Sequence, residues 1–175
     1  IIADSERDMA AERVTVKLDK SVLTRDHLMM LDLVANFDWK RPLAFTQASM
    51  LKDYGLVDYA RFNGYSYLFV PIRTPYVRGS EAGSLNVDDV YAQYVGEATD
   101  ELHQPLRFGN LADEDVYSDY FVRYNLSASR IRENFARMAS ALIRRSTDED
   151  MAKAETLLDR GLEVLPPKQV GYSHS

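Results

Sequence analysis

The sequence predicts an α/β fold, in which a small, mostly parallel sheet with flanking helices is followed by a C-terminal helical subregion. In the first half of the chain, short apolar runs that suit strands alternate with segments of helical spacing. From about residue 113 onward, apolar residues recur only at helical spacing. We therefore expect five parts: a loose or helical lead-in (1–13), an α/β subregion (14–98), a connection (99–112), a helical subregion (113–167) and a disordered tail (168–175).

The expected nucleus of the α/β subregion is the segment Thr24–Thr46. Residues 14–18 alternate between apolar and polar side chains, which predicts a first strand that is half-buried. Thr24 then caps a helix whose apolar residues lie almost all round it, so we expect burial on more than one side. Residues 39–42, Trp-Lys-Arg-Pro, end that helix, and residues 43–47 are typical of a short buried strand. Strand, helix and strand in this order imply a right-handed parallel crossover.

The stretch that follows leaves two alternatives. Residues 49–54 predict one or two helical turns that end at a glycine. Within residues 56–72, either Gly64 stops a short helix before a strand, or two strands meet at a tight turn formed by Asn63 and Gly64. Helical spacing fits slightly better, so we favour a helix followed by a strand. Both alternatives make residues 67–70 a strand.

The remaining elements are a loop and a series of helices. Residues 73–86 are rich in glycine, serine and other turn-forming residues and predict a surface loop. Asn86 caps an amphipathic helix that runs to about residue 98, with Asp89 as the partner in a variant of the capping box. After the connection, the pattern predicts three more helices, which start at Asp113, run over Ala128–Arg145 and run over Met151–Leu165.

Composition limits the function classes. The 175 residues are 46% hydrophobic, which suits one folded domain. A formal net charge of −6 argues against nucleic acid as a partner. The chain has no cysteine, so disulfides and thiolate zinc sites are excluded, and no apolar run approaches the ~18 residues of a membrane span. Because the chain starts at Ile1 without a signal peptide, we expect it to be a piece of a longer protein.

No pattern predicts catalytic residues, a metal ion or a cofactor. Asp26 and His27 are an adjacent acid and imidazole, but neighbouring helix residues do not face each other. Asp32 stands alone in an apolar helix, where we expect Lys40 or Arg41 to neutralise it. The remaining acidic groups begin predicted helices, where the helix dipole favours negative charge: 88–89, 113–115 and 148–150.

Two sets of residues are candidates for binding. The first stands beside loops or element ends and suits a sugar or a small substrate: Trp39, Arg41, Gln47, Tyr65, Arg73 and Tyr76. The second is a row of arginines every seven residues along one helix: Arg130, Arg137 and Arg144. This row suits an anionic membrane surface or an acidic partner, and a merely solvated helix face is the alternative reading.

The last two helices resemble a single tetratricopeptide repeat. In the first of them, residues 135, 138, 139 and 142 have the bulky, bulky, small and bulky side chains of that repeat, and Ala154, Leu158, Gly161 and Pro166 match the second helix and its end. The turn over residues 146–150 is about three residues longer than the repeat's. The resemblance implies that the pair docks on the α/β half or on the preceding helix, because one repeat cannot bury its own face.

More of the chain resembles the C-terminal soluble domain of a family of bacterial multi-spanning membrane proteins of unknown function. That family is similar to protein O-mannosyltransferases, and a related animal protein carries a similar tail. The residues that carry the resemblance follow one another in order: Asn36–Leu43 with Asp32-Leu33 before it, Gly64, Val70-Pro71-Ile72, Phe108–Leu111, Val116-Tyr117, Asn134–Arg137 and Ala141-Leu142.

The resemblance implies a non-catalytic accessory or interaction domain of a glycosyltransferase-like integral membrane protein. It would lie on the extracytoplasmic, periplasmic side of a bacterial inner membrane. Its expected partners are the membrane-embedded part of the same polypeptide and a glycan or protein acceptor, and catalysis would belong to regions outside this chain. Two alternatives stay open: an independent enzyme or sugar-binding domain with a site at the carboxyl ends of the strands, near Thr46, Gln47 and Arg73, and a protein–protein interaction module.

Overall fold

A computed structural model of the chain describes residues 2, 4–18, 21–74, 83–97, 104–113 and 128–168. The chain divides into two compact units, Ile1–Leu85 and Asn86–Ser175. Each unit has its own core. Several predicted features lie outside the described residues: most of the loop after Thr74, the helix expected after Asp113, and the tail beyond Lys168.

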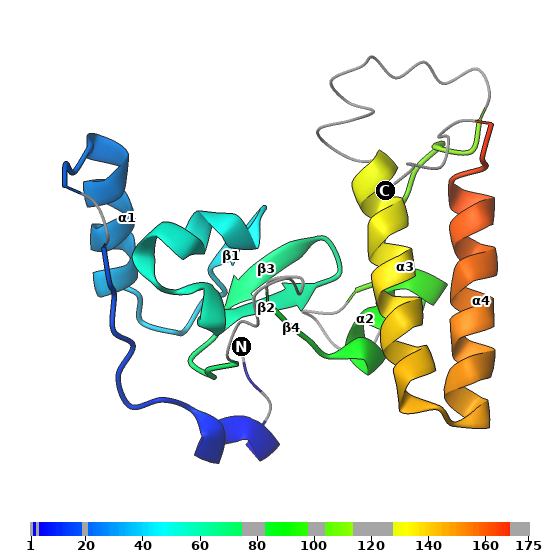
Figure 1. Cartoon of the computed structure of the whole chain (residues 1–175), viewed down its shortest axis with the longest axis horizontal. Coiled ribbons are helices and arrows are strands. Elements are labelled where there is room, and N and C mark those ends of the chain that lie inside the picture. The colour runs from blue at the N-terminus through cyan, green and yellow to red at the C-terminus, as the bar shows by residue number, and fades with distance from the viewer. Residues whose placement is uncertain are drawn as a thin grey trace. The chain divides into compact units, whose positions relative to one another are not determined.

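The first unit has a small mixed sheet (Figure 1). Its strands are β1 (Ala44–Phe45), β2 (Ala60–Asn63), β3 (Ser66–Phe69) and β4 (Ser84–Leu85), in the order β1-β3-β2-β4. β3 runs antiparallel to both of its neighbours, and only β2 and β4 are parallel. The α/β class is confirmed, but the prediction of a mostly parallel sheet is wrong.

The sheet is not mostly parallel because the predicted first strand does not join it. Residues 14–18 are extended without ladder pairing, and the Lys17 backbone N–H donates to the Tyr54 carbonyl at 2.9 Å. This segment also passes close to Gly55, whose φ of +67° forms the left-handed cap that we predicted. Without a strand before it, the helix that follows cannot form a parallel crossover.

A hairpin takes the place of the favoured helix in residues 56–72. Only the 3-10 turn η3 (Val57–Tyr59) is helical there, after the longer 3-10 helix η2 (Ala48–Tyr54). Asn63 pairs with Ser66 across the turn, so the alternative of two strands joined by a tight turn is the correct one, with Gly64 and Tyr65, one residue later than expected, as the turn residues. Gly64 adopts a φ of +79°, which suits such tight turns. The strand predicted at residues 67–70 is confirmed within one residue by β3.

Helix α1 (Arg25–Ala35) lies beside this sheet and follows the lead-in, which contains the 3-10 helix η1 (Asp4–Met9). The core of the first unit is formed mainly by residues of η2 and the hairpin and contains Phe45, Leu51, Leu56, Ala60 and Phe69. Only one side of α1 packs against this core, through Met30, Leu31 and Val34. The expectation that α1 is buried on more than one side is wrong, since none of its residues is buried.

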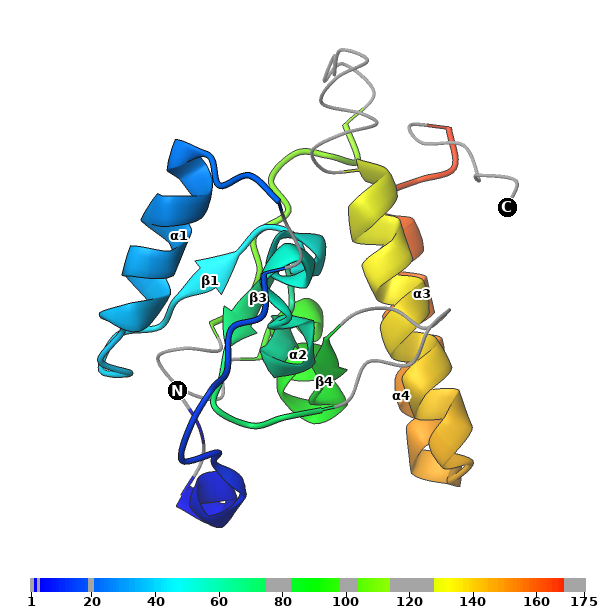
Figure 2. The ribbon, with the colours of Figure 1, turned by 60° about the vertical axis from the view of Figure 1, so that its left-hand side comes forward.

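The second unit consists of helices α2 (Val87–Val95), α3 (Ala128–Arg145) and α4 (Asp148–Val164). α3 and α4 form an antiparallel hairpin and lie side by side in Figure 1, and α3 lies in front of α4 in Figure 2. Their turn is only Ser146 and Thr147, so the long turn that we predicted is wrong. α4 starts three residues early because Thr147 caps it and acidic residues in a first turn are favoured by the helix dipole.

The core of the second unit is aromatic where α2 meets α3. The Tyr94 and Phe135 rings meet edge to face at 4.7 Å, and Phe108 lies 5.7 Å from Phe135. Aliphatic side chains continue this core between α3 and α4: Ile131, Met138, Leu142 and Leu157. Among the described residues, no helix combines the length and apolar character that crossing a membrane requires. The likeness of α3 and α4 to a tetratricopeptide repeat stays a prediction.

Candidate interaction surfaces

The first candidate surface is the side of α1 that faces away from the core. Three apolar side chains are exposed there: Leu28 by 54%, Met29 by 67% and Leu33 by 47%. Val22 and Leu23 in the preceding segment are exposed as well. We call these five residues the α1 outer face. Adjacent exposed apolar residues of this size mark interaction sites more often than isolated ones do.

Hydrogen bonds at both ends fix α1. At its start, the Thr24 hydroxyl donates to the Asp26 carboxylate, which lowers the pKa of Asp26 below its ordinary value, and the Thr24 backbone N–H donates to His27 Nδ1 at 3.1 Å. At its end, Asn36 Nδ2 donates to the Asp32 carboxylate at 2.9 Å. The expectation that Lys40 or Arg41 neutralises Asp32 is therefore wrong: Asp32 is exposed and bonded to a neutral amide. Among the described residues, Lys40 pairs with Asp38.

Two of the predicted binding residues follow α1. Trp39 has a φ of +60°, uncommon for an aromatic residue, and its ring stacks on Phe69 at 5.0 Å. Phe37 lies 4.6 Å from the Trp39 ring on another side, so the indole belongs to the packing of the first unit. Arg41 is exposed.

The structure does not gather the other predicted residues at one edge of the sheet. Gln47 precedes η2 and accepts a hydrogen bond from the Ser49 hydroxyl. Arg73 forms an ion pair with Asp58 at 3.0 Å, and Tyr65 is exposed at the hairpin turn. Because β1 and β3 are antiparallel, their carboxyl ends point in opposite directions, which removes the geometric reason for a site at the strand ends. Tyr76 lies outside the described residues.

The arginine row does lie along one side of α3, as its spacing predicted. Arg130 and Arg137 are half-buried, whereas Arg144 is exposed. The neighbouring Arg145, which is not part of the row, bonds both carboxylate oxygens of Asp88 at 3.0 and 3.1 Å. This hydrogen bond raises the pKa of Arg145 and ties α2 to the end of α3.

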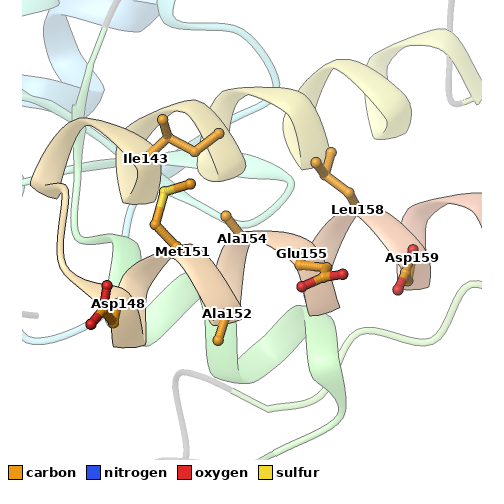
Figure 3. A pocket seen from close by; sticks show the side chains of 8 residues that line it. All are labelled: Ile143, Asp148, Met151, Ala152, Ala154, Glu155, Leu158 and Asp159. Atoms are coloured by element: carbon orange, nitrogen blue, oxygen red, sulfur yellow. The ribbon is translucent and has the colours of Figure 1, made fainter.

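The second candidate surface is a groove of about 590 Å³ along the α3–α4 hairpin. Its lining contains the apolar side chains of Ile143, Met151 and Leu158, which extend from the two helices into the space between them (Figure 3). Alanines 152 and 154 also line the groove. Three carboxylates, Asp148, Glu155 and Asp159, line α4 beside the apolar side chains. We call this site the α3–α4 groove.

The sequence patterns did not identify this groove. Leu158 was matched to the second helix of the repeat, yet it is 43% exposed, and Met151 was identified only as the first residue of the last helix. The signal was present in the spacing: Met151, Leu158 and Leu162 follow one another at i, i+7 and i+11, next to the core row of α4 and not within it. Across the described ranges, no three acidic or histidine side chains are grouped so that they could hold a metal ion.

Comparison with known proteins places the first half of the chain in a family. Residues 1–89 match a family model described as TMEM260-associated domain 2. This range contains the whole first unit, including the α1 outer face, and it ends inside α2. No curated protein and no solved structure matches the chain.

Proposed function

This chain belongs to the TMEM260-associated domain 2 family, and from that premise we propose that its first unit docks on the membrane-embedded part of its own glycosyltransferase-like polypeptide. The family description associates the domain with TMEM260, and the chain is accordingly an accessory domain of a membrane protein. In this proposal the domain is non-catalytic and positions the larger protein or its acceptor. It uses the α1 outer face as its contact.

The observation that carries this proposal is the exposure of the α1 outer face within the family-matched residues. Met29 exposes 67% of its surface although α1 already packs Met30, Leu31 and Val34 against the core. Fully burying a side chain of this kind contributes about 1.5–3 kcal/mol. Burying the remaining exposed surface of several such residues on one helix therefore favours association with a neighbouring protein surface, against the entropic cost of association.

The chemistry of this face favours a protein surface over a sugar. Sugar sites need hydrogen-bonding groups beside an accessible aromatic ring, whereas Leu28, Met29 and Leu33 offer neither. The charges on α1 are mixed, with Arg25 beside Asp26 and Asp32, so simple attraction to anionic lipid is not favoured. An apolar surface of a partner protein with a polar rim fits both features.

Two further parts of the proposal come from the resemblance described above. The domain lies on the extracytoplasmic, periplasmic side of a bacterial inner membrane, and it engages a glycan or protein acceptor there. Fusion of alkaline phosphatase after Ser175 of this chain, within the full-length protein, tests the first part, because that reporter is active only outside the cytoplasm. The alternatives of an enzyme or sugar-binding domain stay predictions.

The docking test uses two exposed positions of α1. We expect the membrane-embedded part, expressed separately and immobilised in detergent, to retain the 175-residue chain. The double variant Met29→Glu with Leu33→Glu places two carboxylates in the contact and should reduce retention by about tenfold or more, since each desolvated charge is costly. Both side chains are exposed in the chain alone, so its stability should change little.

A matched control separates docking from a general loss of apolar surface. Met50 is 47% exposed in η2 of the same unit, and Met50→Glu should leave retention unchanged. Equal loss with Met50→Glu, or full retention of the α1 double variant, would contradict docking through the α1 outer face.

A further inference from the structure

We propose that the α3–α4 groove binds a basic amphipathic helix of a partner protein. This proposal concerns residues outside the family match and is independent of docking through α1. It rests on three features of the groove: its exposed apolar lining, its carboxylates that form no ion pair within the described residues, and its length.

The apolar lining is exposed on a hairpin that is otherwise well packed. Leu142 and Leu157 are fully buried between the helices, whereas Ile143, Met151 and Leu158 expose 43–49% of their surfaces into the groove. These three side chains are on the same side of the hairpin in Figure 3. A helix that inserts aliphatic side chains into such a groove removes this surface from water.

The carboxylates of α4 divide into two groups. Outside the groove each has a partner: Glu149 bonds Lys153 at 2.6 Å, Asp150 lies 3.6 Å from Arg145, and Glu163 bonds Arg160 at 3.0 Å. The three groove carboxylates Asp148, Glu155 and Asp159 have no ion pair with any cation in the described part of the chain. The helix dipole stabilises the negative charge of Asp148 in the first turn of α4. Glu155 and Asp159 lie beyond that turn, so the dipole does not stabilise their charges.

The unpaired carboxylates form a row parallel to the apolar side chains. Asp148, Glu155 and Asp159 are spaced i, i+7 and i+11, which puts them on one side of α4 next to Met151 and Leu158. A partner that fits both rows presents aliphatic residues to the groove and lysine or arginine beside them. Charge complementarity therefore selects a basic partner over an acidic or neutral one.

The length of the groove selects a helix. Residues 148 and 159 are 11 positions apart on α4, or about 16 Å at 1.5 Å per residue, which is about three helical turns. A partner helix with aliphatic residues at i, i+4, i+7 and i+11 spans this distance with one continuous stripe. Aliphatic anchors at this spacing together with lysines beside them define the expected ligand.

The test measures binding of a synthetic peptide to the 175-residue chain. The probe is a peptide of about 18 residues with leucines at that spacing, lysines on both sides of the stripe and alanines elsewhere, and its counterpart carries glutamate in place of every lysine. By fluorescence anisotropy we expect one lysine peptide per chain. We expect the glutamate peptide to bind at least about tenfold more weakly, and higher salt to weaken the lysine peptide.

Variants of the groove residues test whether the peptide binds in the α3–α4 groove. Glu155→Lys with Asp159→Lys reverses two exposed charges and should weaken the lysine peptide by about tenfold, and Leu158→Ser should weaken it by about fivefold or more. Glu133→Lys on the exposed side of α3 and Met9→Ser in η1 are controls that should change affinity less than twofold. Circular dichroism of each variant confirms that α3 and α4 remain folded.

Three results would overturn the proposal. The first is equal affinity for the lysine and glutamate peptides, or no binding of either one. The second is binding of the lysine peptide that the charge-reversal variant leaves unchanged. The third is a dimer of the chain that Leu158→Ser dissociates, because the groove would then be occupied by a second copy.

Discussion

At the scale of single residues, the contact between Gly161 and Phe135 shows how closely α3 and α4 pack. A Cβ atom at position 161 would lie 3.1 Å from Phe135 Cγ and 3.3 Å from its Cδ1. The Phe135 ring is 2% exposed and is held between Tyr94 and Phe108, so it has little room to move away. A side chain at position 161, in the last turn of α4, would therefore press on this ring, although glycine itself lowers helix stability.

Gly161→Ala should therefore destabilise the chain. Inside a helix, replacing glycine with alanine normally raises the stability by about 1 kcal/mol. Forcing Phe135 aside in a packed core, however, costs about 1–3 kcal/mol. We expect a net loss of about 1 kcal/mol in the free energy of unfolding, measured by urea denaturation. The control is Ala136→Gly at an exposed position of α3, which measures only the difference in helix propensity between alanine and glycine. It should lower the free energy of unfolding by about 1 kcal/mol. A gain in stability with Gly161→Ala would show that the ring has room to move.

A second residue-scale effect is the pKa of Asp26. The hydrogen bond from the Thr24 hydroxyl lowers this pKa, so the folded-state pKa is below that of the unfolded chain. The ionised form then contributes stability that is fully present above about pH 4 and is lost as the pH falls through the folded-state pKa. Thr24→Val should raise the pKa of Asp26 toward its ordinary value, whereas Thr24→Ser should keep it low. Carbon-detected NMR titration of Asp26 measures both, and equal pKa values in all three proteins would contradict this account.

At the scale of elements, local patterns predicted the helices well and the sheet poorly. The span of α3 and the cap at Gly55 follow from spacing within a few residues, and both are confirmed. The direction of the strands depends on what residues 14–18 contact and on which turn forms at Asn63-Gly64. The first choice is made by a contact far apart in sequence, between Lys17 and Tyr54, which spacing alone does not contain. The second is made locally, where helical and strand spacing fitted residues 56–63 almost equally well.

The start of α4 shows a competition between two local signals. Apolar spacing placed it at Met151, but Thr147 caps an earlier start: its Oγ1 accepts from the Asp150 N–H at 3.1 Å and donates to the Asp150 carboxylate at 2.8 Å. Removal of this cap in Thr147→Ala should cost about 1–2 kcal/mol of stability, whereas Thr147→Ser should cost only a few tenths. Thermal unfolding followed by circular dichroism measures the difference. Equal melting temperatures for the alanine variant and the parent would show that the cap contributes nothing.

At the scale of the whole molecule, both candidate surfaces are apolar faces that the described chain leaves exposed. The apolar pattern of α1 was evident in the sequence. Such a pattern indicates that a helix face is suited to burial, but it does not show whether this chain or another protein covers that face. The same reason applies to Leu158, which matched the second helix of the repeat and is nevertheless 43% exposed. Of the predicted binding residues, Trp39 packs within the first unit and Arg73 pairs with Asp58, because aromatic and charged residues serve structure as readily as binding.

The α1 outer face is proposed to contact the membrane-embedded part of the same polypeptide. The most direct measurement is photo-crosslinking in the full-length protein in its own membrane, with benzoylphenylalanine at position 29 and, as a control, at position 50. We expect a crosslink from position 29 to a membrane-embedded segment of the same polypeptide, identified by mass spectrometry, and none from position 50. Crosslinks from position 29 only to other proteins, or none at all, would contradict it.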